Sequence, residues 1–312
     1  MVKDKDRQSI NVAKLYYKSE YSQNEIAKLL NISRPTVSKL LKYAKEKSYV
    51  TIQINDPMDG LDDLSLALKN KYNLKDVIIA ISPLNDDYEI KKQIGYVAAN
   101  YLNDIVKDGD VIGISWGTTM YSVAKQLNIK KLKNVQVVQL KGGLSHTHID
   151  TYASEVNDLF TRAFNAEGRA LPLPVIFDSP ELKKITEKDS HINGIIKMGE
   201  KANIAIFSTG TVEDDALLFR LGYFSKEEKK RIQNHAVGDV CSRFFDKYGN
   251  ICDEKINSRT VGIALDELRK KDISILVAGG ERKLNSLHVA LTSKIANTLV
   301  TDQFTAKLLL SK

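Results

Sequence analysis

The sequence predicts an α/β protein in which an N-terminal winged helix-turn-helix is joined to a Rossmann-like domain with a mostly parallel sheet. Three observations support this prediction. Residues 22–44 contain two short amphipathic helical patterns separated by a tight turn. From residue 76 onward, short apolar runs alternate with helical patterns, as in βαβ units. The 312 residues, 43% of them hydrophobic, suffice for about two domains of roughly 150 residues each.

The first part begins with two helices whose start signals are explicit. Ser22 and Glu25 form an S-x-x-E capping box, which satisfies free amides and starts the first helix. Asn31 lies in the turn, Ser33 is a good N-cap for the second helix, and Pro35 is tolerated in its first turn. The apolar positions of the second helix recur at i, i+3, i+4 and i+7, so they face inward: Val37, Leu40, Leu41 and Ala44.

Apart from Pro35, the other residues of the second helix are basic or carry hydroxyl groups. Such donors near the start of a recognition helix can reach base edges and phosphates in the major groove. Residues 1–55 hold eleven Lys or Arg and five Asp or Glu, which is +6 of the chain's formal +7. This segment is therefore predicted to bind double-stranded DNA, and an ordinary solvated helical hairpin is the alternative. The predicted contacts are Ser33, Arg34, Thr36, Ser38, Lys39 and Lys42.

The flanks of this motif complete a small domain. A helix near residues 9–19 would be its third member, and the alternating run 49–54 reads as a strand that could form a wing. Residues 55–60 (NDPMDG) break the pattern, so we expect domains at 1–56 and 57–312. The leucine-rich helix predicted to follow either pairs protomers or packs only on its own domain.

The second part is predicted to be an open parallel sheet, because its apolar runs are short and continuous, as in strands buried on both faces. The expected strands are 77–81, 111–115, 135–140, 204–208, 273–278 and 298–301. Helical patterns lie between them at 94–106, 119–127 and 153–164. In such sheets, ligands bind beyond the carboxyl ends of the strands.

One strand end has the composition of a phosphate cradle. Strand 111–115 runs into Trp116 and then Gly117, Thr118 and Thr119, where a helix begins. Glycine lets an anion approach the backbone, threonine hydroxyls donate, and the helix start adds free amides. A plain strand-to-helix turn is the alternative. Neither a Walker motif nor a Rossmann fingerprint occurs, which disfavours ATP and NAD.

A second strand ends in a lysine and two glycines, Lys141, Gly142 and Gly143, with Ser145 close behind. A lysine at the exit of a buried strand can pair with an anionic ligand or, when desolvated, attack an aldehyde as an amine. A lysine that reaches solvent between loops is the alternative reading.

Further strand ends repeat the small-residue theme. Gly210 follows a third strand, Arg282 and Lys283 follow a Gly-Gly pair, and Asp239 offers a carboxylate to sugar hydroxyls. His146 and His148 lack acidic or thiol neighbours, so no metal is expected. The two cysteines, Cys241 and Cys252, have no metal-type spacing and read as reduced residues. Because no signal peptide or long apolar run is present, we expect a cytoplasmic protein without membrane contact.

Together these features resemble the SorC family of bacterial transcriptional regulators. The stretches that carry the resemblance cover both expected domains in order: YSQNEIAKLLNISRPTVSKLLKYAKEKSYV, VKDGDVIGISWGTTM, VQLKGG, AVGDVCSRFFDKYGNI and VAGGERK. The resemblance implies that the second domain binds a sugar phosphate and is related to sugar-phosphate isomerases. It also implies a homo-oligomeric repressor of deoxyribonucleoside catabolism genes that deoxyribose 5-phosphate releases from DNA.

Transferred by position, the resemblance implies a set of effector-binding residues, with no catalytic residue and no cofactor. Lys141 would be the residue that forms a Schiff base, if binding is covalent. The set is Gly117, Thr118, Thr119, Lys141, Gly142, Gly143, Ser145, Gly210, Asp239 and Lys283. Two other functions stay open at this point: a regulator that responds to another sugar phosphate, and a sugar-phosphate isomerase or aldolase with a DNA-binding head.

Overall fold

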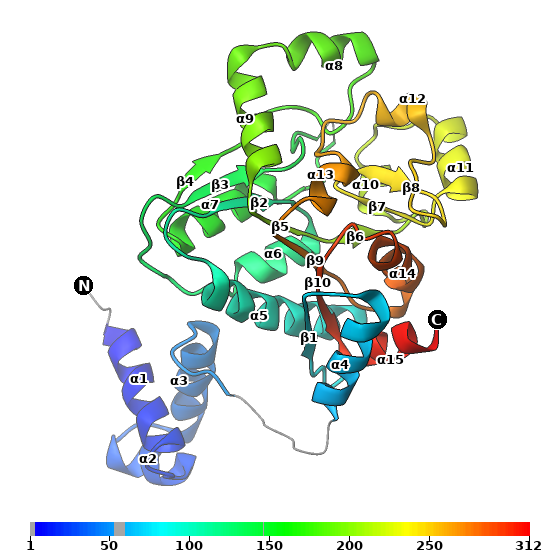
Figure 1. Cartoon of the computed structure of the whole chain (residues 1–312). Helices are drawn as coiled ribbons and strands as arrows, with labels where there is room; N and C mark the ends of the chain where they lie inside the picture. Colours follow the sequence, from blue (N-terminus) through cyan, green and yellow to red (C-terminus); the bar gives the residue numbers. More distant parts are fainter. Residues whose placement is uncertain (1–3, 53–59, 146) are drawn as a thin grey trace. The chain divides into compact units, whose positions relative to one another are not determined.

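The computed structural model of the chain describes residues 4–52, 60–145 and 147–312. The chain divides into two compact units, Met1–Asp59 and Gly60–Lys312, which we call the head and the body (Figure 1). Most of the break that we expected at residues 55–60 lies outside the described residues. The head is built around one apolar cluster and the body around others, so the two units have separate cores.

Over residues 4–52 the head contains three helices: α1 (Asp4–Tyr17), α2 (Gln23–Leu29) and α3 (Arg34–Glu46). The structure confirms the capping box, because Ser22 N donates to Glu25 Oε2 at 2.8 Å and Glu25 N donates to Ser22 Oγ at 3.3 Å. Asn31 takes the left-handed conformation (φ 51°) that the tight turn requires. The apolar faces of the helices meet in one cluster, made of Val12, Ala13, Ile26, Val37, Leu40, Leu41 and Ala44.

The prediction of a wing strand is wrong for residues 49–52, the part of the run that the structure describes. Residues 49–52 form no strand, and residues 53 and 54 lie outside the described residues. Tyr49 N and Val50 N instead donate to Ala44 O, at 2.8 and 3.3 Å, and close the end of α3. Val50 packs on the cluster of the head. A run with β pattern thus serves as a helix cap here.

The body is an α/β unit around a seven-stranded, wholly parallel sheet with the order β1-β10-β9-β5-β2-β3-β4. The six predicted strands are all present, with ends shifted by a residue or so. The strands are β1 (Asp76–Ala80), β2 (Val111–Ile114), β3 (Gln136–Gln139), β4 (Glu167–Arg169), β5 (Ile204–Phe207), β9 (Ile273–Val277) and β10 (Thr298–Asp302).

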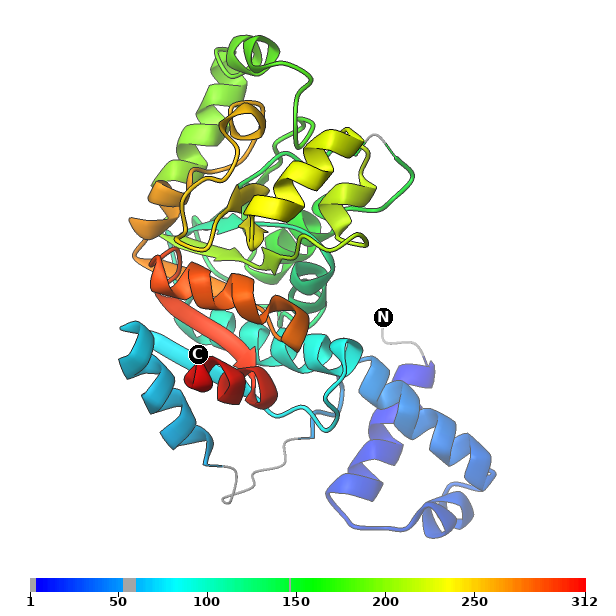
Figure 2. The ribbon, with the colours of Figure 1, turned by 90° about the vertical axis from the view of Figure 1, so that its right-hand side faces the viewer.

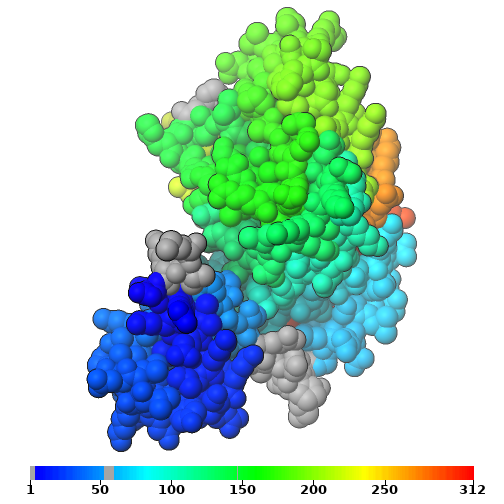
Figure 3. Space-filling model, turned by 90° about the vertical axis from the view of Figure 1, so that its left-hand side faces the viewer, coloured from blue at the N-terminus to red at the C-terminus, as the bar shows by residue number. Residues whose placement is uncertain are grey.

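Alternate strand residues point to opposite sides of this sheet, so its continuous apolar strands make both faces apolar. Helices therefore cover both faces. Ile204 and Ile206 of β5 join the cluster that includes α5, α6 and α7, whereas Ala205 and Phe207 join the cluster of α4, α14 and α15. These helices are α4 (Leu61–Tyr72), α5 (Asp87–Ile105), α6 (Thr118–Ala124), α7 (Ala153–Ala163), α14 (Leu284–Thr292) and α15 (Gln303–Ser311). Figure 2 shows α4 and α15 beside the β1 edge, and Figure 3 shows the surface of the body from the opposite side.

A second, antiparallel sheet was not predicted. It consists of β6 (Thr209–Gly210), β7 (Gly238–Val240) and β8 (Arg243–Phe245), and it continues from the end of β5. The body also has further helical elements. They are α8 (Pro180–Thr186), α9 (Ser190–Lys201), α10 (Leu217–Arg220), α11 (Lys226–His235), α12 (Glu254–Asn257), α13 (Leu265–Arg269) and the 3-10 turn η1 (Glu281–Lys283). Among them, α9 contacts β2 and β3 of the parallel sheet.

The leucine-rich helix α4 packs on the body itself. Leu68 and Tyr72 are buried there, and the Tyr72 hydroxyl donates to Leu309 O of α15 at 3.0 Å. The packing of α4 on its own domain is thus confirmed, whereas pairing of protomers through the same helix stays a prediction. Within the described residues, no helix is long and apolar enough to cross a membrane.

Candidate functional site

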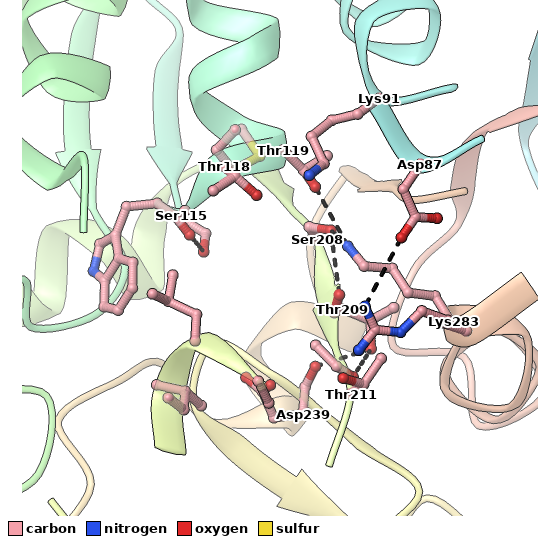
Figure 4. A pocket seen from close by; sticks show the side chains of 18 of the residues that line it. Asp87, Lys91, Ser115, Thr118, Thr119, Ser208, Thr209, Thr211, Asp239 and Lys283 are labelled. Atoms are coloured by element: carbon pink, nitrogen blue, oxygen red, sulfur yellow. Dashed lines mark hydrogen bonds and ion pairs between the residues drawn. The ribbon is translucent and has the colours of Figure 1, made fainter. Parts of the chain in front are cut away.

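The strand order creates one crevice in the parallel sheet. The chain proceeds outward from β2 to β3 and β4, then returns to β5 on the other side of β2. Ligands of open α/β sheets bind at this kind of switch point, beyond the carboxyl ends of the strands. A cavity of about 280 Å³ lies there, and its lining includes the segments that follow β2, β5 and β9 (Figure 4).

The segment after β2 presents the predicted cradle to this cavity. Gly117 has φ +123°, in the region that favours glycine, and no side chain caps helix α6 behind it. Thr118 and Thr119 line the cavity, and Thr119 is buried. Lys283 reaches across from η1, and its Nζ donates to Thr119 Oγ1 and to Ser208 Oγ, both at 3.3 Å. Hydroxyl groups from two strand ends thus converge on one ammonium group.

Lys283 is held in an environment that disfavours its charge. Burial, with the nearby charge of Lys91, lowers the pKa of Lys283 to about 8, although the Asp239 carboxylate favours the charged form. An amine with this pKa is largely protonated at neutral pH yet poorly compensated by carboxylates. It is therefore suited to an anionic ligand.

Lys141 lies in the same cavity and is almost completely buried, at 5% exposure. Its Nζ lies 3.6 Å from the ring centroid of Trp116, whose Nε1 donates to Gly142 O at 2.8 Å. Burial lowers the pKa of Lys141, and the charges of Asp239 and Cys241 oppose that change. The alternative of a solvated lysine is therefore wrong for this structure. A buried amine with a lowered pKa can act as a nucleophile.

Asp239 supplies the buried carboxyl group of the cavity. Its Oδ2 accepts from Ser242 N at 2.9 Å. Burial raises the pKa of Asp239, whereas Lys141, this hydrogen bond and Lys283 act to lower it. Gly210 lies directly against it, since a Cβ atom at Gly210 would stand 2.0 Å from Asp239 Oδ1. Glycine is needed here so that the carboxylate can enter the cavity.

Three predicted effector-binding residues do not line the cavity. Gly142 packs against backbone, because a Cβ there would lie 2.4 Å from Pro174 O, and Gly143 packs against Ala153. Ser145 hydrogen-bonds with Thr147 in the following loop. The two glycines allow the close backbone packing that fixes the strand exit carrying Lys141. The other members of the predicted set do line it: Gly117, Thr118, Thr119, Lys141, Gly210, Asp239 and Lys283.

The Arg282-Lys283 pair is divided between two tasks. Lys283 points into the cavity (Figure 4), whereas Arg282 forms salt bridges with Glu213, Asp215 and Asp87. Arg282 Nε donates to Glu213 Oε2 at 2.6 Å. These carboxylates already neutralise Arg282, so only one cation of the pair faces a ligand.

Sequence reasoning missed the contribution of helix α5, which follows β1. Asp87 and Lys91 lie on this helix and line the cavity. Neither residue directly follows a glycine or one of the strand ends from which the site was predicted. Their spacing of four residues, which puts both on one helix face, was the one available signal.

The candidate DNA-binding residues all lie on the exposed side of α3. Ser33 caps the helix by accepting from Thr36 N at 3.3 Å, and the two hydroxyl groups are 2.8 Å apart. Lys42 forms one long ion pair with Glu46, at 3.8 Å, with both side chains largely exposed. The exposed residues are Ser33, Arg34, Thr36, Ser38, Lys39 and Lys42. The apolar back of α3 fixes the helix while this face stays open to solvent.

Comparison with known proteins defines the class of the chain. Residues 56–311 match the family described as "Putative sugar-binding domain". The crystal structure of the full-length sorbitol operon regulator SorC from Klebsiella pneumoniae superposes with a TM-score of 0.79 and 29% identity, covering 97% of this chain and 98% of that one. The chain belongs to the SorC family of transcriptional regulators, and these relatives are regulators rather than enzymes.

Within this family the chain is similar to a nucleoside regulator. It is 53% identical over 311 residues to the deoxyribonucleoside regulator of Bacillus subtilis (strain 168). The alignment covers 100% of this chain and 99% of that protein. Identity to the sorbitol operon regulator of Klebsiella pneumoniae is 30% over 316 residues, covering 98% of each.

Proposed function

We propose that the protein is a cytoplasmic, homo-oligomeric repressor of deoxyribonucleoside catabolism genes, and that deoxyribose 5-phosphate releases it from operator DNA. One observation carries the proposal: the cavity at the switch point combines a buried, desolvated lysine with a separate cation-and-hydroxyl cradle. An aldehyde sugar with a terminal phosphate matches these two features. The 53% identity to a deoxyribonucleoside regulator supports the choice of sugar.

The phosphate is proposed to bind at Gly117, Thr118, Thr119 and Lys283. Charge-assisted hydrogen bonds to phosphate oxygens are the strong ones, and two threonine hydroxyls with a lysine supply such donors. The sugar then extends toward Lys141 and Asp239, which line the same cavity. Gly210 keeps the space beside Asp239 open, while Gly142 and Gly143 act indirectly by holding the Lys141 strand exit.

We further propose that Lys141 binds the sugar as an imine. A 2-deoxy sugar with a phosphate on its 5-oxygen cannot close to a pyranose, so a fraction of it presents an open aldehyde. The neutral amine adds to the aldehyde carbon, and the adduct loses water to form C=N. Borohydride adds hydride to that carbon and leaves a stable secondary amine on Lys141. An unmodified Lys141 peptide at saturating sugar phosphate would contradict covalent binding and leave reversible binding at the same residues.

The proposed DNA contacts come from α3 of each protomer: Arg34, Ser38, Lys39 and Lys42, with Ser33 and Thr36 at its start. Helix-turn-helix proteins bind two half-sites about one helical turn apart, which is why an oligomer is expected. Induction requires that the sugar phosphate bind better to the arrangement that fits DNA worse. Sedimentation of the free protein, the DNA complex and the induced state tests this coupling.

The decisive experiment measures release of operator DNA against a panel of pentose, hexose and triose phosphates. We expect deoxyribose 5-phosphate to release the DNA at the lowest concentration. Release by another sugar phosphate in the panel would keep the regulator but change its inducer. Failure of every member to release DNA would refute the proposed function.

A further inference from the structure

We propose that Lys91 is a second phosphate-binding cation of the cavity, and that Lys91 and Lys283 together select phosphorylated sugars over neutral ones. This inference rests on the proposed function, because it concerns how the same cavity recognises its ligand. It adds a residue from helix α5, an element that the strand-end motifs do not include.

The position of Lys91 is set by close packing of α5 on α6. The Ser122 hydroxyl of α6 donates to Lys91 O at 3.0 Å. One turn later, Gly95 lets the helices approach, since a Cβ there would lie 2.7 Å from Ser122 Oγ. Figure 4 shows the Lys91 side chain reaching toward Thr118 and Thr119, with Lys283 close by. Lys91 therefore stands over the start of α6, beside the proposed phosphate position.

The charges around Lys91 point to an anionic ligand. Next to burial, the charge of Lys91 is the main cause that lowers the pKa of Lys283. In the parts of the chain that the structure describes, no salt bridge to a carboxylate involves Lys91, and Asp87, one turn earlier, pairs with Arg282. Lys91 and Lys283 thus face, together with the amine of Lys141, one cavity whose buried carboxylate is Asp239. A phosphate dianion between them removes this repulsion, whereas a neutral sugar leaves it in place.

The chain offers a matched control in the next residue. Lys92 lies on the same helix with the same charge, but it is exposed, pairs with Glu89 at 3.0 Å and does not line the cavity. Exchanging either lysine for glutamine changes the net charge equally. A difference between the two variants therefore reports position rather than overall electrostatics.

The experiment is calorimetric titration of the full-length wild type, Lys91→Gln and Lys92→Gln with deoxyribose 5-phosphate, with deoxyribose and with inorganic phosphate. We expect Lys91→Gln to weaken deoxyribose 5-phosphate and phosphate binding by about 10-fold or more. Its affinity for deoxyribose should not change, and Lys92→Gln should match the wild type throughout. Lys91→Arg, which keeps the charge, should restore most of the loss and shows that the variant loss is not misfolding.

The outcomes separate this inference from the proposed function. If Lys91→Gln binds deoxyribose 5-phosphate like the wild type while Lys283→Gln does not, Lys91 has no such role and the function stands. Equal losses in Lys91→Gln and Lys92→Gln would also overturn it, since the effect would then be general electrostatics. A wild type that binds no sugar phosphate would refute the proposed function itself.

Discussion

The head and the body present their cations in opposite ways. Arg34, Lys39 and Lys42 of α3 project from an exposed helix face, whereas Lys141 is buried and Lys283 is half-buried in the lining of the cavity. Exposed charges attract a polyanion over a distance of about a Debye length and lose little hydration. Buried amines have already lost hydration, so only a ligand that fits the cavity can compensate them. The head is therefore expected to bind DNA in a salt-dependent way, and the cavity of the body to bind only a ligand that fits it.

The largest effect is expected from removal of the Lys141 amine. Lys141→Ala should abolish DNA release by deoxyribose 5-phosphate and leave affinity for operator DNA unchanged, because Lys141 lies in the body cavity. Fluorescence anisotropy of labelled operator during sugar-phosphate titration measures both quantities. Equal damage to DNA binding and to release would break the division between head and body.

A smaller effect is expected when a side chain fills the space beside the buried carboxylate of Asp239. Gly210→Ala should destabilise the body by about 2–3 kcal/mol, because the new Cβ meets Asp239 Oδ1 at 2.0 Å. The matched control is Gly194 in α9, where a Cβ would have nothing within 4 Å. Gly194→Ala should stabilise by about 0.5–1 kcal/mol through helix propensity. Urea unfolding of both variants gives the comparison, and a neutral Gly210→Ala would contradict the packing argument.

The cavity should also depend on pH where the head does not. The pKa of Lys283 is about 8, and a bound phosphate favours its protonated form, so binding takes up a proton above this pH. Affinity for deoxyribose 5-phosphate should therefore fall about 10-fold or more between pH 7.5 and 9.5. Phosphate itself stays dianionic there, since its second pKa is about 6.

This pH profile is best measured in a Lys141→Ala background, where imine formation does not contribute. Lys283→Arg should flatten the profile, because arginine keeps its charge over the whole range. A fall of equal size in Lys283→Arg would assign the proton to another group. DNA affinity over the same range serves as the control from the head.

The smallest effects belong to single exposed cations. Arg34→Ala should weaken operator binding by about 1 kcal/mol or more, and Lys42→Gln should mainly lower the salt dependence by a slope of about 1. Neither should change sugar-phosphate affinity. Anisotropy at several salt concentrations distinguishes the two, and a salt slope unchanged in Lys42→Gln would remove Lys42 from the phosphate contacts.

The sequence predicted the features that depend on local chemistry. Six of the seven parallel strands appear in the sequence as short apolar runs, whereas β4 (Glu167–Arg169) has no such pattern and was missed. The helix caps of the head appear as Ser22, Glu25 and Ser33. Residues at strand ends, such as Thr119 and Lys141, could be placed near one cavity because parallel strands end at one edge. This reasoning required only the period of the pattern and the rule for parallel sheets.

Other features depend on packing between distant segments, and the sequence did not reveal them. Lys91 enters the cavity because Gly95 lets α5 approach α6. The small sheet of β6, β7 and β8 has strands of two or three residues, too short for an alternating pattern. The run 49–52 carries a strand pattern but has its amides occupied by the end of α3. Gly142 reads as a ligand contact until its backbone neighbours are known.

The edge strand β1 has a consequence for the order in which the protein folds. It pairs with β10 over five positions, and α4 just before it packs on α15, so the first elements of the body rest on the last ones. Contacts in the head, by contrast, span fewer than fifty residues. On the ribosome the head can fold early, while α4 and β1 wait until nearly the whole chain has been synthesised. A nascent chain stalled before β10 would therefore carry a folded head on an incompletely folded body.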